Sequence, residues 1–172
     1  MDKPGTKIPR MSEKRAVAVS EDYARRIVDA LGAPRAKGRP SSDTSPCGNE
    51  NSMAKKFWAL HVENVLVPPQ SQEATFLKAR EIVEGMGFRM QEFATNSVEG
   101  AGAGNLIAMN SEDGFKITLH STSPPEEIGI MISSPCLERA PEEQADPSTE
   151  PESPPPRQNN FNLSSSVPRS AL

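Results

Sequence analysis

Residues 115–132 read FKITLHSTSPPEEIGIMI, and this stretch decides the expected fold. Two runs within it alternate between large apolar residues and other residue types, and the turn at Ser123-Pro124-Pro125 separates them. The apolar positions are Phe115, Ile117, Leu119, Ile128, Ile130 and Ile132. Alternation with a period of two is typical of strands that bury one face. The stretch therefore predicts two strands of a sheet that has one apolar face.

The segments upstream predict a helix and further strands. Residues 57–67 alternate as a strand, with Trp58, Leu60 and Val62 expected inward. Ser71 is expected to cap a helix that buries Phe76, Ala79 and Val83. Residues 88–95 and 105–109 are expected as strands, with a possible bulge at Phe93 and a mobile glycine-rich loop at 100–104. The order β-α-β-β-β-β predicts an α+β fold, in which an antiparallel sheet of about four or five strands carries the helix on one face.

The domain boundaries follow from composition. Residues 1–19 are basic and expected to be disordered. A single domain is expected over 20–136, with its core at 47–136 and a short helix at 20–31 that Ser20 caps and Gly32 ends. Residues 33–44 are expected as a linker, and residues 137–172 as a disordered, acidic, proline-rich tail.

The charge distribution disfavours two classes of partner. Residues 41–136 hold six basic and twelve acidic residues, a net charge of −6, whereas residues 1–40 have a net charge of +5. An acidic domain repels nucleic acid and anionic lipid. No apolar run approaches the roughly 20 residues of a transmembrane helix. The run Ala16-Val17-Ala18-Val19 is too short for the apolar part of an export signal, so no signal peptide is visible.

The only two cysteines bracket the apolar part of the chain. Ser45-Pro46-Cys47 precedes it and Ser134-Pro135-Cys136 ends it. This placement favours a structural disulfide. Two unpaired thiols, or a catalytic or metal-binding pair, are the other interpretations, although the spacing matches neither Cys-x-x-Cys nor a zinc pattern.

No residue is assigned a catalytic, cofactor-binding or metal-binding role. His61 and His120 are both expected on the polar side of their strands, where they would face solvent. If they faced the same way they could join Glu63 in a cluster, but no His-x-His or His-Glu-x-x-His spacing supports one. The glycine-rich stretch at 100–104 has no Gly-Lys-Ser/Thr sequence and no helix after it, which argues against a phosphate-binding loop.

The last hairpin and the terminal cysteine motif resemble a known family. The residues that carry the resemblance are Gly87-Phe88, Asp113-Gly114-Phe115, and the run from Ile130 to Ser134-Pro135-Cys136. The pattern is similar to that of a family of small, uncharacterised secreted proteins and lipoproteins from actinobacteria, over about residues 20–136. The resemblance implies an envelope location and a disulfide between Cys47 and Cys136, and it implies no activity.

The sequence thus favours a non-enzymatic secreted or envelope domain with a binding or structural role. Its partner would be a protein or another envelope component, and no cofactor is expected. An intracellular regulatory or interaction module of ferredoxin-like type, in the cytoplasm, is the alternative. A hydrolase with a site at His61, Glu63 and His120 is a third hypothesis.

Overall fold

The computed structural model describes residues 9–47, 55–95, 97–98, 101–102, 104–123 and 126–140. The chain divides into two units, Met1–Glu142 and Glu143–Leu172, and every described residue belongs to the first unit. Residues 1–8 of the predicted basic terminus lie outside the described residues, and so does the predicted tail from Pro141 onward.

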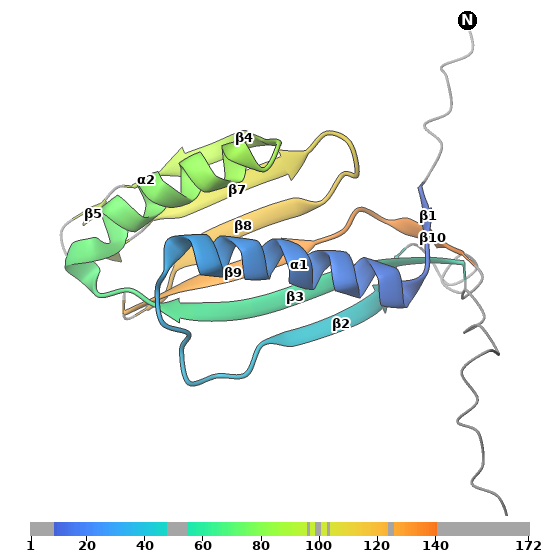
Figure 1. Cartoon of the computed structure of the whole chain (residues 1–172), viewed down its shortest axis with the longest axis horizontal. Helices are drawn as coiled ribbons and strands as arrows, with labels where there is room; N and C mark the ends of the chain where they lie inside the picture. Colours follow the sequence, from blue (N-terminus) through green and yellow to red (C-terminus); the bar gives the residue numbers. More distant parts are fainter. Residues whose placement is uncertain are drawn as a thin grey trace, which may run out of the picture. The chain divides into compact units, whose positions relative to one another are not determined.

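An eight-stranded sheet forms one layer, and two helices form the other (Figure 1). The hydrogen-bonded path runs β1-β10-β3-β9-β8-β7-β4, and β2 also pairs with β3. A separate hairpin joins β5 (Ser97–Val98) to β6 (Ala101–Gly102), whereas Gly100 and Ala103 of the predicted loop lie outside the described residues. The strands of the large sheet are β1 (Arg10–Met11), β2 (Ser41–Pro46), β3 (Lys56–Leu66), β4 (Phe88–Ala94), β7 (Asn105–Asn110), β8 (Lys116–Ser121), β9 (Glu127–Ser133) and β10 (Leu137–Arg139).

The predicted α+β class is confirmed, but the predicted strand count and order are wrong. The short parallel pair of β1 and β10 makes the sheet mixed, although the other strand pairs are antiparallel. The missed strands are short or polar, as in the Ser41–Pro46 segment, and they carry no apolar alternation. Strand β10 also extends the folded segment beyond the predicted boundary at residue 136.

Helix α1 spans Glu13–Leu31 and begins seven residues earlier than predicted. Its N-cap is Ser12, whose side chain accepts the Arg15 backbone N–H at 3.2 Å. Ser20 is buried in mid-helix and donates its hydroxyl to the Ala16 carbonyl. Its hydroxyl is satisfied inside the helix, so the prediction that Ser20 caps the helix, and that the helix starts there, is wrong. Gly32 ends the helix in the left-handed conformation (φ 68°), as predicted.

Helix α2 spans Pro69–Gly85 and begins after Pro68 rather than at Ser71. Proline fits the first helical turn because its missing N–H would have no partner there. The predicted buried face is confirmed: Phe76, Ala79 and Val83 are all buried. Helix α2 connects β3 to β4, which lie four strands apart in the path.

Both helices lie on the same face of the sheet, where they enclose the core (Figure 1). Helix α1 contacts β3 and β9, and α2 contacts β4 and β7. The alternation in residues 115–132 places its apolar side chains beneath the helices, as predicted. Seven of the largest side chains with no solvent exposure are Ile27, Phe115, Ile117, Leu119, Ile128, Ile130 and Ile132.

Strand β3 has the predicted bounds to within one residue, but the face that it turns toward the helices is the opposite of the predicted one. Phe57, Ala59 and Val65 are fully buried beneath α1, together with His61 and Glu63. Trp58, Leu60 and Val62 lie on the other face and are half-buried. Both sets of alternate residues are largely apolar, so hydrophobicity alone does not decide which face turns inward. The predictions that Trp58 faces the core and that His61 faces solvent are therefore wrong.

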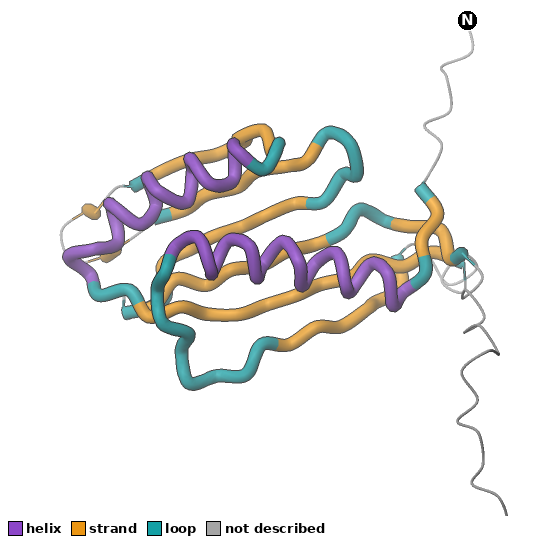
Figure 2. The backbone as a smooth tube through the Cα atoms, viewed as in Figure 1, coloured by secondary structure: helices purple, strands orange, loops and turns teal. Residues whose placement is uncertain are grey.

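The predicted linker between α1 and β2 contains structure of its own. Arg35 forms an isolated antiparallel bridge with Val65, and the Leu66 N–H donates to the Pro34 carbonyl at 2.7 Å. Figure 2 shows this loop passing beside the end of β3 before the chain enters β2. The predicted bulge in β4 is confirmed, with a register shift between Met90 and Glu92.

The two cysteines pair as a disulfide, with Cα atoms 6.1 Å apart. Cys47 follows β2, and Cys136 lies between β9 and β10. Leu137 pairs with Phe57, as Pro46 does, so the bridge joins neighbouring segments at one end of β3. The structure thus places the two cysteines at the distance of a disulfide, as predicted.

Truncation of Ile130 tests the buried face. Ile130→Ala should lower the free energy of unfolding by about 2–5 kcal/mol, because the removed side-chain atoms come from a fully buried site. Leu77→Ala is the matched control, since Leu77 is 47% exposed on α2 and should change stability by less than about 0.5 kcal/mol. Urea unfolding followed by the fluorescence of the single tryptophan measures both. Equal losses in the two variants would contradict the assignment of faces.

Opening the disulfide should destabilise the domain strongly. The bridge closes a loop with a sequence separation of 89, for which the chain-entropy model gives about 4–5 kcal/mol. The Cys47→Ser/Cys136→Ser double variant should therefore unfold at a lower urea concentration than the oxidised protein. The reduced wild-type protein should match the double variant. If reduction left the unfolding midpoint unchanged, the bridge would have no stabilising role.

Candidate functional site

Two ionisable residues on β3 are buried beneath α1. His61 is 5% exposed and Glu63 is 6% exposed. They are two residues apart on one strand, so both side chains point to the helix-covered face. Burial of such groups is costly unless they have hydrogen-bond partners. Their partners therefore define the site.

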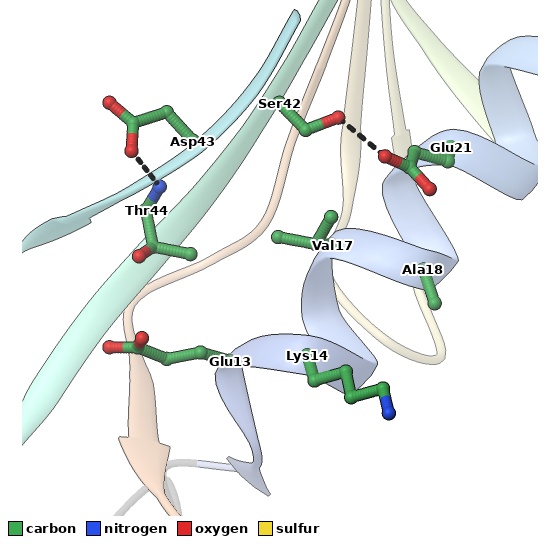
Figure 3. Close-up of a pocket in the computed structure, with 8 residues that line it drawn as sticks. All are labelled: Glu13, Lys14, Val17, Ala18, Glu21, Ser42, Asp43 and Thr44. Atoms are coloured by element: carbon green, nitrogen blue, oxygen red, sulfur yellow. Dashed lines mark hydrogen bonds between the residues drawn. The ribbon is translucent and has the colours of Figure 1, made fainter.

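Ser42 connects His61 to the surface. Its Oγ lies 2.8 Å from His61 Nδ1 and also donates to Glu21 Oε1 at 2.7 Å. Figure 3 shows Ser42 on β2 pointing across to Glu21 on α1, at one end of a groove between these two elements. Ser42 opposes His61 directly in the β2–β3 register, and this pairing places its hydroxyl beside the imidazole.

Glu63 completes the inner end of this chain of contacts. Its Oε1 lies 3.4 Å from His61 Nε2, and its Oε2 lies 3.6 Å from Arg35 Nε. Oε2 accepts no hydrogen bond. The Arg35–Val65 bridge holds the arginine beside Glu63, so the loop after α1 supplies the counter-charge. We name the set Glu21, Ser42, His61, Glu63 and Arg35 the buried polar chain.

The hydrogen atoms in this chain can be assigned from its contacts. Ser42 has one hydroxyl hydrogen and gives it to Glu21, so its oxygen can only accept from His61 Nδ1. A bond to Glu63 needs a hydrogen on Nε2. The imidazole thus lies between the Ser42 hydroxyl and the Glu63 carboxylate.

The three residues predicted as a possible cluster are not brought together. His120 is exposed on the opposite face of the sheet from His61 and Glu63, with its ring against Gly129. A Cβ on Gly129 would lie 2.6 Å from His120 Cε1, so only glycine leaves room for this ring. The hydrolase site proposed at His61, Glu63 and His120 is therefore wrong in its membership.

Ser42, His61 and Glu63 have the order of a nucleophile, a base and an orienting acid, but the surroundings do not suit acyl transfer. The Glu21 carboxylate lies 2.7 Å from the Ser42 oxygen, where a developing oxyanion would meet negative charge. Residues 33–44 have the composition of a linker, so the sequence does not predict the role of Ser42. The residues from Ser41 to Thr44 are all polar, so this strand has no apolar alternation that could reveal it.

The groove between α1 and β2 is lined by four charged residues, and the three carboxylates among them already have partners. Glu13 pairs with Arg139, Glu21 accepts from Ser42, and Asp43 accepts the Thr44 N–H at 2.8 Å. Among the described residues, no group of three or more His, Cys, Asp and Glu side chains is placed to hold a metal ion. The carboxylates of this groove are therefore already engaged by neighbouring residues and are poorly placed to bind a ligand.

The face of the sheet opposite the helices carries a row that is apolar except for Thr118. Ile107, Thr118, Met131 and Val62 are direct cross-strand neighbours on β7, β8, β9 and β3, and each is half-buried. Four adjacent strands span about 14 Å. Two of the three large hydrophobic residues that are exposed in the described ranges, Leu66 and Met109, also lie on this face. We name this surface the open face.

Two cations flank Met109 on the open face. In the strand register, Arg89 on β4 and Lys116 on β8 both oppose Met109 on β7. Both are exposed, and within the described part of the chain neither forms an ion pair. The open face therefore combines an apolar centre with unneutralised positive charge at one side.

Comparisons with protein-family models, with curated proteins and with solved structures found no match to this chain. No helix in the described ranges is both long and apolar enough to cross a membrane.

Removal of Glu63 tests the buried polar chain. Glu63→Ala leaves the His61 Nε2–H without its acceptor, and we expect a loss of about 1–3 kcal/mol in the free energy of unfolding. Glu21→Ala removes the exposed end of the same chain and should cost less than about 1 kcal/mol. Urea unfolding of both variants measures the difference. A loss in Glu21→Ala as large as in Glu63→Ala would contradict the view that the buried end carries the stability.

Proposed function

We propose that this chain is a non-enzymatic binding domain of a secreted or envelope protein, and that a partner protein packs on the open face. The observation that supports the proposal most is the apolar row across β7, β8, β9 and β3. A sheet buries its apolar side chains against another layer, and both described helices lie on the opposite face. Apolar patches left at a surface commonly mark interaction sites.

The charges on the open face suggest the chemistry of the partner. Arg89 and Lys116 flank the exposed Met109 and lack a carboxylate partner among the described residues. A partner whose surface is apolar at its centre and carries carboxylates at its rim would neutralise these two cations. Such complementarity contributes mainly to specificity and to the rate of association.

The compartment is proposed on two grounds. The Cys47–Cys136 disulfide is compatible with an oxidising environment, where such bonds form and persist. The resemblance to a family of secreted proteins and lipoproteins points the same way. The buried polar chain supports a non-enzymatic role, because its histidine and inner carboxylate are both inaccessible.

Site-specific photocrosslinking in the native host tests the open face. A photoreactive phenylalanine analogue at Met109 should crosslink to a discrete partner, because Met109 is 37% exposed on the proposed contact surface. The same group at Leu77, which is 47% exposed on α2, is the matched control and should give no such product. Adding Met131→Lys should reduce the Met109 product at least about tenfold, since it places a charge in the apolar row. A product of equal yield from Leu77, or one that is insensitive to Met131→Lys, would reject the open face as the binding surface.

A further inference from the structure

A second groove runs along α1 on the helix-covered side of the sheet. It has a volume of about 490 Å³ and lies between α1 and the turn that joins β7 to β8, with Met11 at one end. Met11, Ala18 and Val19 form its apolar part. The polar residues that line it are Arg15, Asp22, Tyr23, Arg26 and Asp113.

Both carboxylates in this groove already have partners. Asp113 Oδ2 accepts the Tyr23 hydroxyl at 2.5 Å, and its Oδ1 accepts the Phe115 N–H at 3.0 Å. Burial, together with this hydrogen bond, raises the pKa of Tyr23 to about 12, so the hydroxyl keeps the proton that it donates. Asp22 forms an ion pair with Arg25.

The two arginines in the groove have no such partner. Arg15 and Arg26 are both exposed, and neither forms an ion pair within the described ranges. The groove therefore presents two guanidinium groups that form no ion pair with a described carboxylate. A ligand that supplied two anionic groups would complement them.

The spacing of the arginines sets the length of that ligand. They are eleven residues apart on a helix, which is just over three turns, so both lie on one side at about 16 Å along the axis. Side chains of an extended peptide alternate in direction, so only residues with an even separation face the same way. Carboxylates at the first and fifth positions lie about 13 Å apart on one side, and the flexible arginine side chains would cover the remaining distance of about 3 Å. An apolar side chain between them would lie over Ala18 and Val19.

We propose that this groove binds an extended acidic peptide segment whose two carboxylates, four residues apart, pair with Arg15 and Arg26. The site is separate from the open face, because it lies on the other side of the sheet, and it does not depend on the function proposed above. A polyanion such as nucleic acid fits less well, since it would bring charge along a domain whose residues 41–136 have a net charge of −6.

Fluorescence anisotropy with two labelled hexapeptides of equal charge tests the proposal. The probe is acetyl-Glu-Ser-Leu-Ser-Glu-Ser-amide, whose two carboxylates and leucine share one side when it is extended. The control peptide, acetyl-Ser-Ser-Leu-Ser-Glu-Glu-amide, has neighbouring carboxylates that point to opposite sides. The full-length oxidised protein should bind the probe about tenfold more tightly than the control peptide, because only the probe spans both arginines. Raising the salt concentration should weaken the binding.

Three variants locate the binding site. Arg15→Gln and Arg26→Gln should each weaken probe binding about tenfold. Lys14→Gln, which removes an exposed cation of the same helix from outside this groove, should change it less than twofold. Thermal unfolding checks that all three remain folded, which their exposed positions favour. Equal binding of the two peptides, equal losses in all three variants, or no probe binding at millimolar protein would overturn the proposal. So would tighter binding of a single-stranded oligonucleotide, which would assign the groove to a polyanion.

Discussion

The side chains of Ile117, Leu119, Ile130 and Ile132 form a layer on which both helices rest. Because the two strands that carry them alternate strictly, all of the aliphatic bulk lies on one face, and the helices must cover that face and no other. The opposite face then carries half-buried residues such as Val62 and Met131, together with the exposed Met109. One-sided burial thus produces both the stable core and the open face. It also leaves the residues of the buried polar chain in a layer where they need partners.

The parts of the fold that the sequence predicts correctly are those with an unambiguous pattern. Strands β8 and β9 alternate between apolar and polar residues, so their faces follow directly. Strand β3 is apolar on both sides, and its orientation depends on which face α1 covers, which is a tertiary effect. The polar strand β2 has almost no pattern, because an edge strand that pairs only with β3 does not need one. The start of α1 was missed because Ser20 resembles a cap, whereas its hydroxyl is satisfied inside the helix.

The candidate sites were predictable to different degrees. The disulfide follows from the placement of the only two cysteines at the ends of the apolar segment. The contact between Ser42 and His61 depends on the β2–β3 register, which joins residues nineteen positions apart and has no local signal. The same holds for Arg35 and Glu63, which meet because the loop after Gly32 turns back along β3. The grooves beside α1 could not be predicted, because Glu13 and Arg15 lie in the part of the helix that precedes its predicted start at residue 20.

The parallel pairing of β1 with β10 has a mechanical consequence. The Glu138 and Ala140 N–H groups donate to the Pro9 and Met11 carbonyls, so the two ends of the described domain are fastened to each other. A pull on the segments before residue 9 and after residue 140 would load these hydrogen bonds in shear. If they broke, tension would pass through the covalent Cys47–Cys136 bond and bypass the residues between them. Most of the sheet would therefore carry no force, and the domain could lengthen only through its outer segments.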